Sequence, residues 1–293
     1  MTSAVRHNLS RHLFQWLGWL LLFSQLNLLA GTQTNSADLM SKGNEAFKKG
    51  DRPGAVSFFT QAISADPSNY VAYYNRGRLH DNEARSEQAL ADYSQLLKIR
   101  PEHSATLQLR GSLHLRLGHF DEAIADFDQY LKLLPANEPY HWQRGIALYY
   151  AGRYEESRLQ WKKCHLAKSN DVETALWHFA CVARSTGLKE ARASLPAAGN
   201  DPRVPLIQLH SFFAGTIQPE EVIATAQAGK PAKDELSRRL FLAEFYLGLY
   251  QEAGGNPKLA LEHLDRALEH SPRGEFLVEL ARSRAEILRK STR

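Results

Sequence analysis

Small and aromatic residues recur along this chain at intervals of 34 residues. A glycine marks each interval, a small residue follows twelve positions later, and an aromatic residue follows sixteen positions after the glycine. The glycines are Gly43, Gly77, Gly111 and Gly145, the small residues are Ala55, Ala89, Ala123 and Ser157, and the aromatic residues are Phe59, Tyr93, Phe127 and Trp161. No stretch alternates with period two for long enough to indicate a strand. The pattern predicts four helical repeats, at residues 36–69, 70–103, 104–137 and 138–171.

Each recurring position has a physical reason. The two small residues let the two helices of a repeat approach closely, and the aromatic residue fills the space between repeats. Pro67, Pro101 and Pro135 end the second helix, because proline lacks an N–H and disfavours helical backbone before it. This combination resembles the tetratricopeptide repeat. The resemblance implies an all-α fold, a right-handed superhelical solenoid of antiparallel helix pairs.

The pattern weakens after residue 171 and returns near the C-terminus. Residues 241–274 match a fifth repeat, with Gly248 and Ala260 at the small positions and Pro272 at the end. Residues 172–240 are interpreted as degenerate helical repeats, which four prolines interrupt between residues 196 and 219. Residues 275–293 predict one amphipathic helix that caps the last hydrophobic face of the solenoid. The whole chain then holds about 14 or 15 helices, two per repeat plus the cap.

The first 35 residues are interpreted as a targeting signal and a linker. Residues 1–13 are polar and basic, and residues 14–30 are 17 residues without a charge. This order is typical of a secretory signal, so residues 1–30 predict a signal peptide or an uncleaved signal anchor, and residues 31–35 a linker. Residues 29–31, directly before Thr32, resemble a bacterial lipobox. The next residue of a lipobox is a cysteine that carries the lipid, but Thr32 has no thiol. We expect an exported, periplasmic or envelope-associated protein that is not lipidated at Thr32; the alternative is a signal anchor in the inner membrane.

Charge and composition exclude several functional classes. The formal net charge is +4, and without the two arginines of the predicted signal it is +2, so no nucleic-acid partner is indicated. Two cysteines exclude a cysteine-rich zinc module. The usual phosphate-binding, metalloprotease and hydrolase motifs do not occur. We therefore predict no cofactor, no metal and no catalytic residues. The alternative is an enzyme or enzyme subunit whose site lies in the irregular region 172–240.

Two kinds of internal pairing are predicted. Cys164 and Cys181 lie on consecutive predicted helices, so a disulfide and two separately packed thiols are the alternatives. An arginine and an aspartate also recur at fixed repeat positions, as Arg76, Arg110 and Arg144, and as Asp92 and Asp126. Because a partly buried arginine is normally paired, the recurrence predicts a ladder of Arg–Asp contacts between helices.

The first helix of each repeat lines the inner surface of such a solenoid. Helical spacing places a stripe of aromatic and amphipathic residues on that surface. The predicted partner-binding groove consists of Asn44, Phe47, Tyr74, Arg78, Asp81, Gln108, Ser112, Trp142, Ile146 and Tyr149. Trp, Tyr and Arg are the usual anchors of protein contacts, so we expect peptides or partner helices to bind here. The alternative is that some of these rings belong to the core or face a helix that lies in the groove.

Two narrower resemblances bear on the partner. One tetratricopeptide subclass binds the C-terminal carboxylate of a partner with lysine, arginine and asparagine side chains at fixed repeat positions. Asn44 and Asn75 match two of these positions, but Met40, Ala105 and Leu109 stand where the subclass has its positively charged residues. The order of parts from residue 144 onward is similar to the NlpI family of bacterial envelope lipoproteins, without their lipid-bearing cysteine. That resemblance implies a scaffold, often dimeric, that brings a processing protease to peptidoglycan hydrolases. We predict an exported, non-enzymatic adaptor for protein–protein interactions, with a homodimer and an N-terminal membrane anchor left open.

Overall fold

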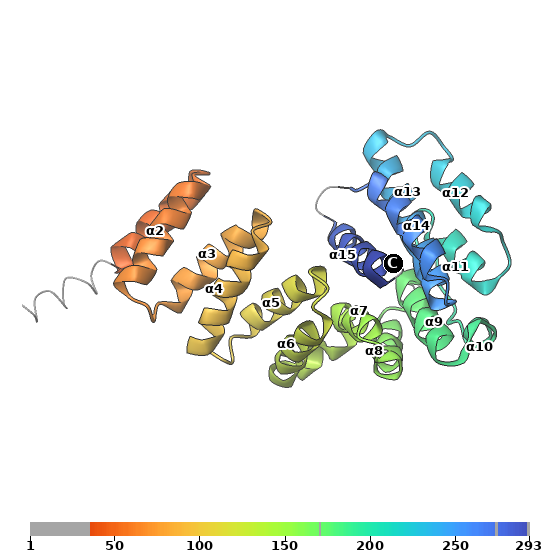
Figure 1. Cartoon of the computed structure of the whole chain (residues 1–293), viewed down its shortest axis with the longest axis horizontal. Coiled ribbons are helices and arrows are strands. Elements are labelled where there is room, and N and C mark those ends of the chain that lie inside the picture. The colour runs from red at the N-terminus through yellow and green to blue at the C-terminus, as the bar shows by residue number, and fades with distance from the viewer. Residues whose placement is uncertain (1–35, 170, 273–274, 292–293) are drawn as a thin grey trace, which may run out of the picture. The chain divides into compact units, whose positions relative to one another are not determined.

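The computed structural model describes residues 36–169, 171–272 and 275–291. Every regular element within these ranges is a helix, which confirms the all-α repeat fold expected from the 34-residue interval (Figure 1). The predicted signal, residues 1–30, and the linker, residues 31–35, lie outside the described residues. No helix among the residues that the structure describes has the length and apolar character needed to cross a membrane.

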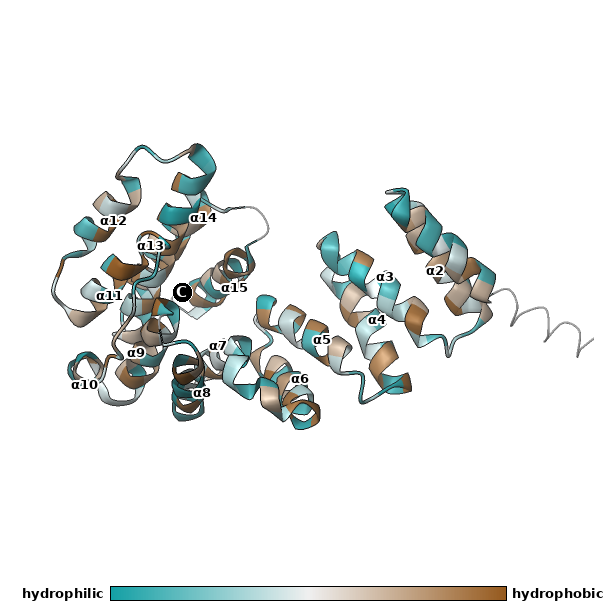
Figure 2. Cartoon of the chain, turned by 180° about the vertical axis from the view of Figure 1, so that it is seen from behind, coloured by the Kyte–Doolittle hydropathy of each residue, from teal (hydrophilic) through white to brown (hydrophobic). Residues whose placement is uncertain are grey.

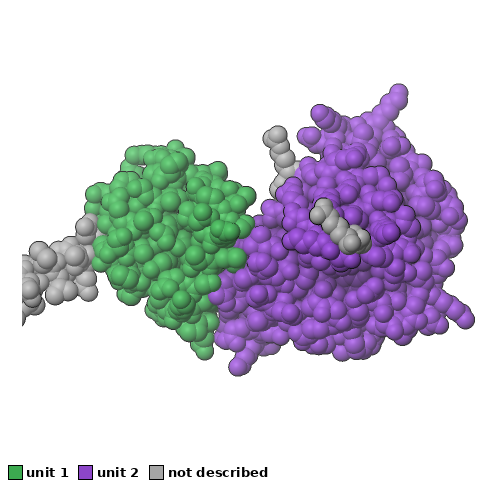
Figure 3. All heavy atoms as spheres, in the orientation of Figure 1, with its two compact units in different colours: residues 1–106 green, residues 107–293 purple. Residues whose placement is uncertain are grey.

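The chain divides into two compact units, residues 1–106 and 107–293 (Figure 3). The described part of the first unit begins with helix at residues 36–48, followed by α2 (Arg52–Ala65), α3 (Tyr70–Asn82) and α4 (Ser86–Ile99). The side chain of Asp51 accepts a hydrogen bond from the N–H of Gly54, and that of Asn69 accepts one from Ala72. These caps satisfy N–H groups that the start of a helix leaves without an intrahelical partner.

The helix α5 (Ser104–Arg116) leads into the second unit. Its further elements are α6 (Phe120–Leu133), a 3₁₀ segment η1 (Pro135–Tyr140), α7 (Trp142–Tyr150), α8 (Tyr154–Ala167), α9 (Val172–Thr186), α10 (Leu188–Ala193), α11 (Leu206–Ala214), α12 (Pro219–Gln227), α13 (Lys233–Ala253), α14 (Pro257–Glu269) and α15 (Phe276–Ser291). Figure 2 shows apolar and polar stretches on the ribbons of the same helices, as amphipathic packing requires.

Two helices of the irregular region start at positions that the repeat interval does not give. The helix α11 begins only at Leu206, because Pro205 disfavours helical backbone in the residue before it. The helix α13 begins at Lys233 and runs through the repeat boundary predicted at residue 241. The last regular pair, α13 and α14, therefore starts with a helix of 21 residues, longer than the first helix of any earlier described repeat.

An aromatic side chain packs against the glycine of each regular repeat. A Cβ atom added to Gly43, Gly77, Gly111 or Gly145 would lie within 2.6–2.9 Å of the ring of Phe59, Tyr93, Phe127 or Trp161, respectively. Real Cβ atoms do not approach other atoms so closely, so only glycine allows this helix spacing. The rings themselves are at most 2% exposed. Each ring therefore packs against the glycine of its own repeat, where the sequence had suggested a place between repeats, and the pair sets the distance between the two helices of a repeat.

The predicted Arg–Asp ladder is confirmed in two repeats. Arg76 donates two hydrogen bonds to Asp92, at 2.9 and 2.6 Å, and Arg110 donates two to Asp126, at 2.8 and 2.7 Å. In the next repeat Gln160 stands where the aspartate would be. Arg144 instead donates to Asp128, at 2.6 Å, and to the side-chain oxygen of Gln160, at 3.2 Å.

We expect Gly111→Ala to lower the free energy of unfolding, although alanine favours helix over glycine by about 1 kcal/mol. The added Cβ would lie 2.7 Å from Cε1 of Phe127. Gly111→Leu should cost at least about 2–3 kcal/mol, the order typical of overpacking. Chemical denaturation measures both, with Ala105→Leu on the exposed face of the same helix as the control. A stabilised Gly111→Ala protein would contradict the close helix contact.

Candidate functional site

A cleft of about 530 Å³ opens in the second unit. Side chains from η1, α7, α8, α9 and α13 and from the start of α15 line it. Its apolar lining includes Trp142, Ile146, Trp161, Trp177, Phe241, Leu242, Phe276 and Leu277. The rings of Trp161 and Trp177 stack with centroids 5.7 Å apart and planes within 7°. Both rings are at most 2% exposed, so they form a rigid inner wall.

The rim of the cleft carries accessible aromatic side chains. Trp142 is 42% exposed and Tyr140 is 61% exposed. The ring of Trp142 meets that of Phe276 edge to face, with centroids 5.1 Å apart. Aromatic surfaces that stay half in solvent are the type of residue that anchors protein contacts. Trp142 therefore stands at the entrance of a site that is aromatic inside.

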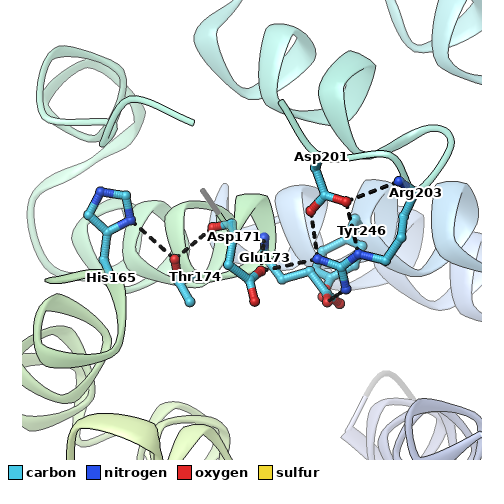
Figure 4. Close-up of polar contacts among 7 residues, drawn as sticks. All are labelled: His165, Asp171, Glu173, Thr174, Asp201, Arg203 and Tyr246. Carbon is cyan, nitrogen blue, oxygen red and sulfur yellow. Dashed lines mark hydrogen bonds and ion pairs between the residues drawn. The ribbon is translucent and has the colours of Figure 1, made fainter. Parts of the chain in front are cut away.

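One side of the cleft is a charged network centred on Arg203 (Figure 4). Arg203 donates to both carboxylate oxygens of Asp201, at 2.9 and 2.6 Å, and to Asp171 at 3.2 Å. It also donates to Glu173, whose second oxygen accepts a hydrogen bond from the hydroxyl of Tyr246. These contacts join the turn before α9, the segment before α11, and α13.

The network shifts the pKa values of its members. Burial alone would raise the pKa of Asp201, but the hydrogen bonds and charge of Arg203 hold it below the ordinary value. Hydrogen bonding to Asp201 raises the pKa of Arg203, and burial raises that of Tyr246. Asp201 and Arg203 therefore keep their charges at neutral pH, and Tyr246 stays protonated. Three carboxylates share one guanidinium here, an arrangement that fixes the wall of the cleft.

The predicted groove residues of α7 differ in how accessible they are. Trp142 and Ile146 both line the cleft, but Ile146 is only 1% exposed. Tyr149 is 2% exposed and packs edge to face on Trp177, with centroids 5.5 Å apart. Ile146 and Tyr149 are thus core residues rather than accessible groove residues, because α7 is packed on several sides.

Gln108 and Ser112, also predicted in the groove, belong to a chain of hydrogen bonds between α5 and α7. The backbone N–H of Arg144 reaches Nδ1 of His141, which leaves Nε2 to donate to Gln108 at 2.8 Å. Gln108 donates to Gln143 at 2.6 Å, and Gln143 donates to Ser112 at 2.8 Å. The two predicted residues therefore join neighbouring repeats.

The predicted groove residues of the first unit are more accessible. Phe47 is 51% exposed, and Asn44 and Arg78 are also exposed, whereas Tyr74 and Asp81 are half-buried. The ring of Tyr74 lies edge to face on His103, with centroids 5.6 Å apart. The two matches to the carboxylate clamp come together, because Asn75 donates to Asn44 at 3.3 Å. The residues that replace the clamp's cations, Met40 and Ala105 among them, bring no positive charge.

Of the two alternatives for the cysteines, the disulfide is not formed. Cys164 and Cys181 are both free and buried, and each thiol has its own partner. Gln160 donates to the sulfur of Cys164 at 3.6 Å, and the thiol of Cys181 donates to Ser157 at 3.1 Å. Burial raises the pKa of both thiols, to about 12 for Cys181. The alternative of separately packed thiols holds. No group of three metal-ligating side chains occurs among the described residues.

The sequence did not point to Arg203 or to Phe276 as site residues. Arg203 lies outside the regular repeats, and its partners Glu173 and Tyr246 are far from it in sequence. Phe276 was assigned to a cap. The only signal available was the run of prolines between residues 196 and 219, which marked this region as irregular without showing what it packs against.

Comparison with known proteins settles the nature of the repeats. Two models of the tetratricopeptide repeat match residues 58–91 and 76–145. The chain contains tetratricopeptide repeats. A solved tetratricopeptide repeat protein from Parabacteroides merdae has a similar fold, with a TM-score of 0.55 at 18% identity, over 86% of this chain and 99% of that one.

Curated relatives match a shorter stretch of the chain. The Hsp70-Hsp90 organizing protein 3 of Arabidopsis thaliana is 44% identical over 52 residues, which is 18% of this chain and 9% of that protein. The Hsp70-Hsp90 organizing protein 1 of Glycine max is 46% identical over 52 residues, with the same coverage. The chain thus spans less than a tenth of the length of these relatives.

The acid stability of the protein should depend on His141 and His178. Burial lowers the pKa of each to about 4, from an ordinary value of 6.5. Between these two values the unfolded chain binds protons that the folded chain does not, so stability is full above pH 6.5 and falls toward pH 4. The loss is up to about 1.4 kcal/mol per pH unit for each histidine. Denaturation of His141→Asn should show a flatter dependence; an unchanged slope would contradict the buried neutral ring.

Proposed function

We propose that this protein is a non-enzymatic adaptor that binds a segment of a partner protein in the cleft of the second unit. The observation that carries the proposal is the accessible Trp142, set beside Phe276 above an aromatic interior. Tetratricopeptide repeats are suited to protein–protein interaction, and this cleft combines an apolar floor with charged side chains. The charged side chains that line it include Lys168, Asp171, Glu173, Arg203, Arg238 and Glu275.

The size and walls of the cleft suit a few residues of a peptide. Pockets of about 300–1,000 Å³ that are mostly apolar, with a few fixed polar groups, are typical ligand sites. Stacked Trp161 and Trp177 and the Arg203 network hold two walls in place, so little ordering is needed on binding. A large apolar side chain that entered the cleft could contact both Trp142 and Phe276.

The alternative of an enzyme in region 172–240 gains no support from the charged network. A carboxylate that serves as a general base must be free to accept a proton, with a pKa near the working pH. Asp201 is tied to Arg203 and its pKa is lowered, and Glu173 already holds Arg203 and the hydroxyl of Tyr246. The arrangement is better suited to fixing the fold of the cleft than to proton transfer.

We further propose that the adaptor works outside the cytoplasm, in the cell envelope. Two features of the sequence support this: the basic and apolar order of residues 1–30, and the resemblance of residues 144–270 to the NlpI lipoproteins. That resemblance suggests a scaffold which recruits proteases or peptidoglycan hydrolases. With Thr32 at the lipid-bearing position, the protein would be released in soluble form or held by an uncleaved N-terminal segment.

Intact mass spectrometry of the exported protein tests this location. We expect a chain that begins near residue 31, without a diacylglycerol adduct. Retention of the first 30 residues would instead support the signal anchor, and failure to leave the cytoplasm would contradict the envelope role.

Replacement of Trp142 tests the binding site. Because Trp142 is accessible, Trp142→Ala should leave the fold intact and weaken partner binding by about 2 kcal/mol or more, roughly thirtyfold. The matched control is Leu259→Ala on α14, which is 45% exposed against 42% for Trp142 but does not line the cleft. Affinity is measured by calorimetry with a partner isolated by crosslinking. Wild-type affinity of a folded Trp142→Ala protein would exclude the cleft.

A further inference from the structure

At two junctions between repeats, the residue that caps the next helix also bonds back to the repeat before it. Asn69 caps α3 and donates from Nδ2 to the hydroxyl of Ser36 at 3.1 Å, 33 residues earlier. His141 caps α7 and donates from Nε2 to Gln108 at 2.8 Å, again 33 residues earlier. In both cases one atom of the side chain holds the helix start and the other closes the junction.

The corresponding junction at His103 lacks this second bond. Nδ1 of His103 accepts a hydrogen bond from the backbone N–H of Thr106, in the first turn of α5, at 3.3 Å, which leaves the proton on Nε2. The residue 33 positions earlier is Tyr70, and its ring centroid lies 6.0 Å from that of His103. No hydrogen bond joins Nε2 of His103 to another residue that the structure describes. This half-buried histidine therefore keeps an N–H donor that is available to a ligand.

A pocket of about 430 Å³ opens at this junction, in the first unit. Tyr70, Arg100, Pro101, Glu102 and His103 line it. The guanidinium of Arg100 lies 4.9 Å from the ring centroid of Tyr70, a cation–π contact that orients it. Arg100 is exposed and forms no ion pair within the described part of the chain. The pocket thus presents a guanidinium and an N–H donor that both lack an acceptor from the protein.

A second tyrosine and a second arginine extend this surface along α3. Tyr74 lies one turn after Tyr70 and meets His103 edge to face, with centroids 5.6 Å apart. The guanidinium of Arg78 lies 5.8 Å from the centroid of Tyr74. Arg78 is exposed and, like Arg100, has no carboxylate partner among the residues described. These five residues, Tyr70, Tyr74, Arg78, Arg100 and His103, are called here the junction site.

Other arginines that lie over tyrosine rings in this protein are paired with an acid. Arg76 lies over Tyr73 and donates to Asp92, and Arg284 lies over Tyr150 and donates to Glu252. In the junction site the aromatic support is present and the acid is missing. A carboxylate from another molecule would supply it, because guanidinium and N–H donors form strong, charge-assisted hydrogen bonds with carboxylate oxygens.

We propose that the junction site binds an extended acidic segment of a partner protein, with acidic side chains at alternate positions. Its two guanidiniums lie against tyrosine rings on successive turns of α3, about 6 Å apart along the helix axis. An extended chain rises about 3.3 Å per residue and points residues i and i+2 to the same side. Two acidic side chains at this interval reach both arginines, and the one at Arg100 also accepts from His103.

The junction site is a second binding site, beyond the proposed role of the cleft. It shares no residue with the cleft. It also differs from the carboxylate clamp, because it includes neither Asn44 nor Asn75 and requires no free C-terminus of the partner.

A labelled peptide tests the proposal by fluorescence anisotropy with the intact protein at low ionic strength. The probe is Gly-Ser-Glu-Ala-Glu-Ser-Gly, amidated so that it carries no terminal carboxylate. Its glutamine counterpart should bind at least about tenfold more weakly, because the charge-assisted hydrogen bonds are lost. The isomer with adjacent glutamates, Gly-Ser-Glu-Glu-Ala-Ser-Gly, should also bind more weakly, because one carboxylate then points away from the site.

Substitutions in the protein locate the bound peptide. Arg100→Gln should weaken binding by about tenfold, the order of one lost charge-assisted contact. The matched control is Arg52→Gln, which removes the same charge from an exposed position of α2 and should bind as the wild type does. His103→Ser keeps an oxygen that caps α5 but has no Nε2, so it should fold and bind more weakly. Circular dichroism checks that each variant is folded.

Three results would overturn the proposal: equal binding of the glutamate and glutamine peptides, equal losses in Arg100→Gln and Arg52→Gln, or equal binding of the two glutamate isomers. Trp142→Ala changes the cleft and should leave binding of this peptide unchanged. Loss of peptide binding in Trp142→Ala would assign the peptide to the cleft and would also overturn the junction site. An unaffected partner in Trp142→Ala would count against the cleft alone.

Discussion

The contact between a glycine on one helix and an aromatic ring on the next sets the geometry on which the regular repeats depend. It brings the two helices of a repeat so close that no Cβ fits at Gly43, Gly77, Gly111 or Gly145. At this distance an arginine one residue before the glycine reaches the side chain sixteen residues further on, as Arg76 reaches Asp92. One steric constraint therefore positions both the apolar core and the partly buried ion pairs of the regular repeats.

The same contact builds the inner wall of the cleft. In the last regular repeat the ring against Gly145 is Trp161, and Trp161 stacks on Trp177 of the irregular region. From there the packing continues through Tyr246 and Glu173 to Arg203. The regular part of the chain thus ends at an aromatic surface, and the irregular part folds over it. Together with the return of α15 to α7, this leaves a hollow edged by Trp142 and Phe276.

The fold was largely predictable from sequence, and the site only in part. Glycine and aromatic positions repeat locally, so register, helix pairs and the Arg–Asp contacts follow from one interval. Trp142 was predicted as an accessible anchor and lines the cleft. Helical spacing alone could not show that Tyr149, unlike Trp142, is buried. The burial of Tyr149 depends on its contact with Trp177, which comes from a later segment of the chain.

Phe276 and Arg203 could not be predicted, because their contacts join segments far apart in the chain. Phe276 meets Trp142 across more than a hundred residues, and Arg203 meets Asp171 and Glu173 across the irregular loop before α11. No periodic signal describes such contacts. For a related reason the sequence left open whether Cys164 and Cys181 pair: spacing places them on consecutive helices, but the free thiols contact Gln160 and Ser157 instead of each other.

The most direct test of a protein-binding cleft is site-specific photo-crosslinking in cells that make the protein. A benzophenone side chain at Tyr140, which is 61% exposed at the rim, is compared with one at Leu166, which is 75% exposed on α8 and does not line the cleft. The account predicts a defined adduct with another protein from position 140 and none from position 166. Equal adducts from both positions, or an adduct from position 166 alone, would contradict it.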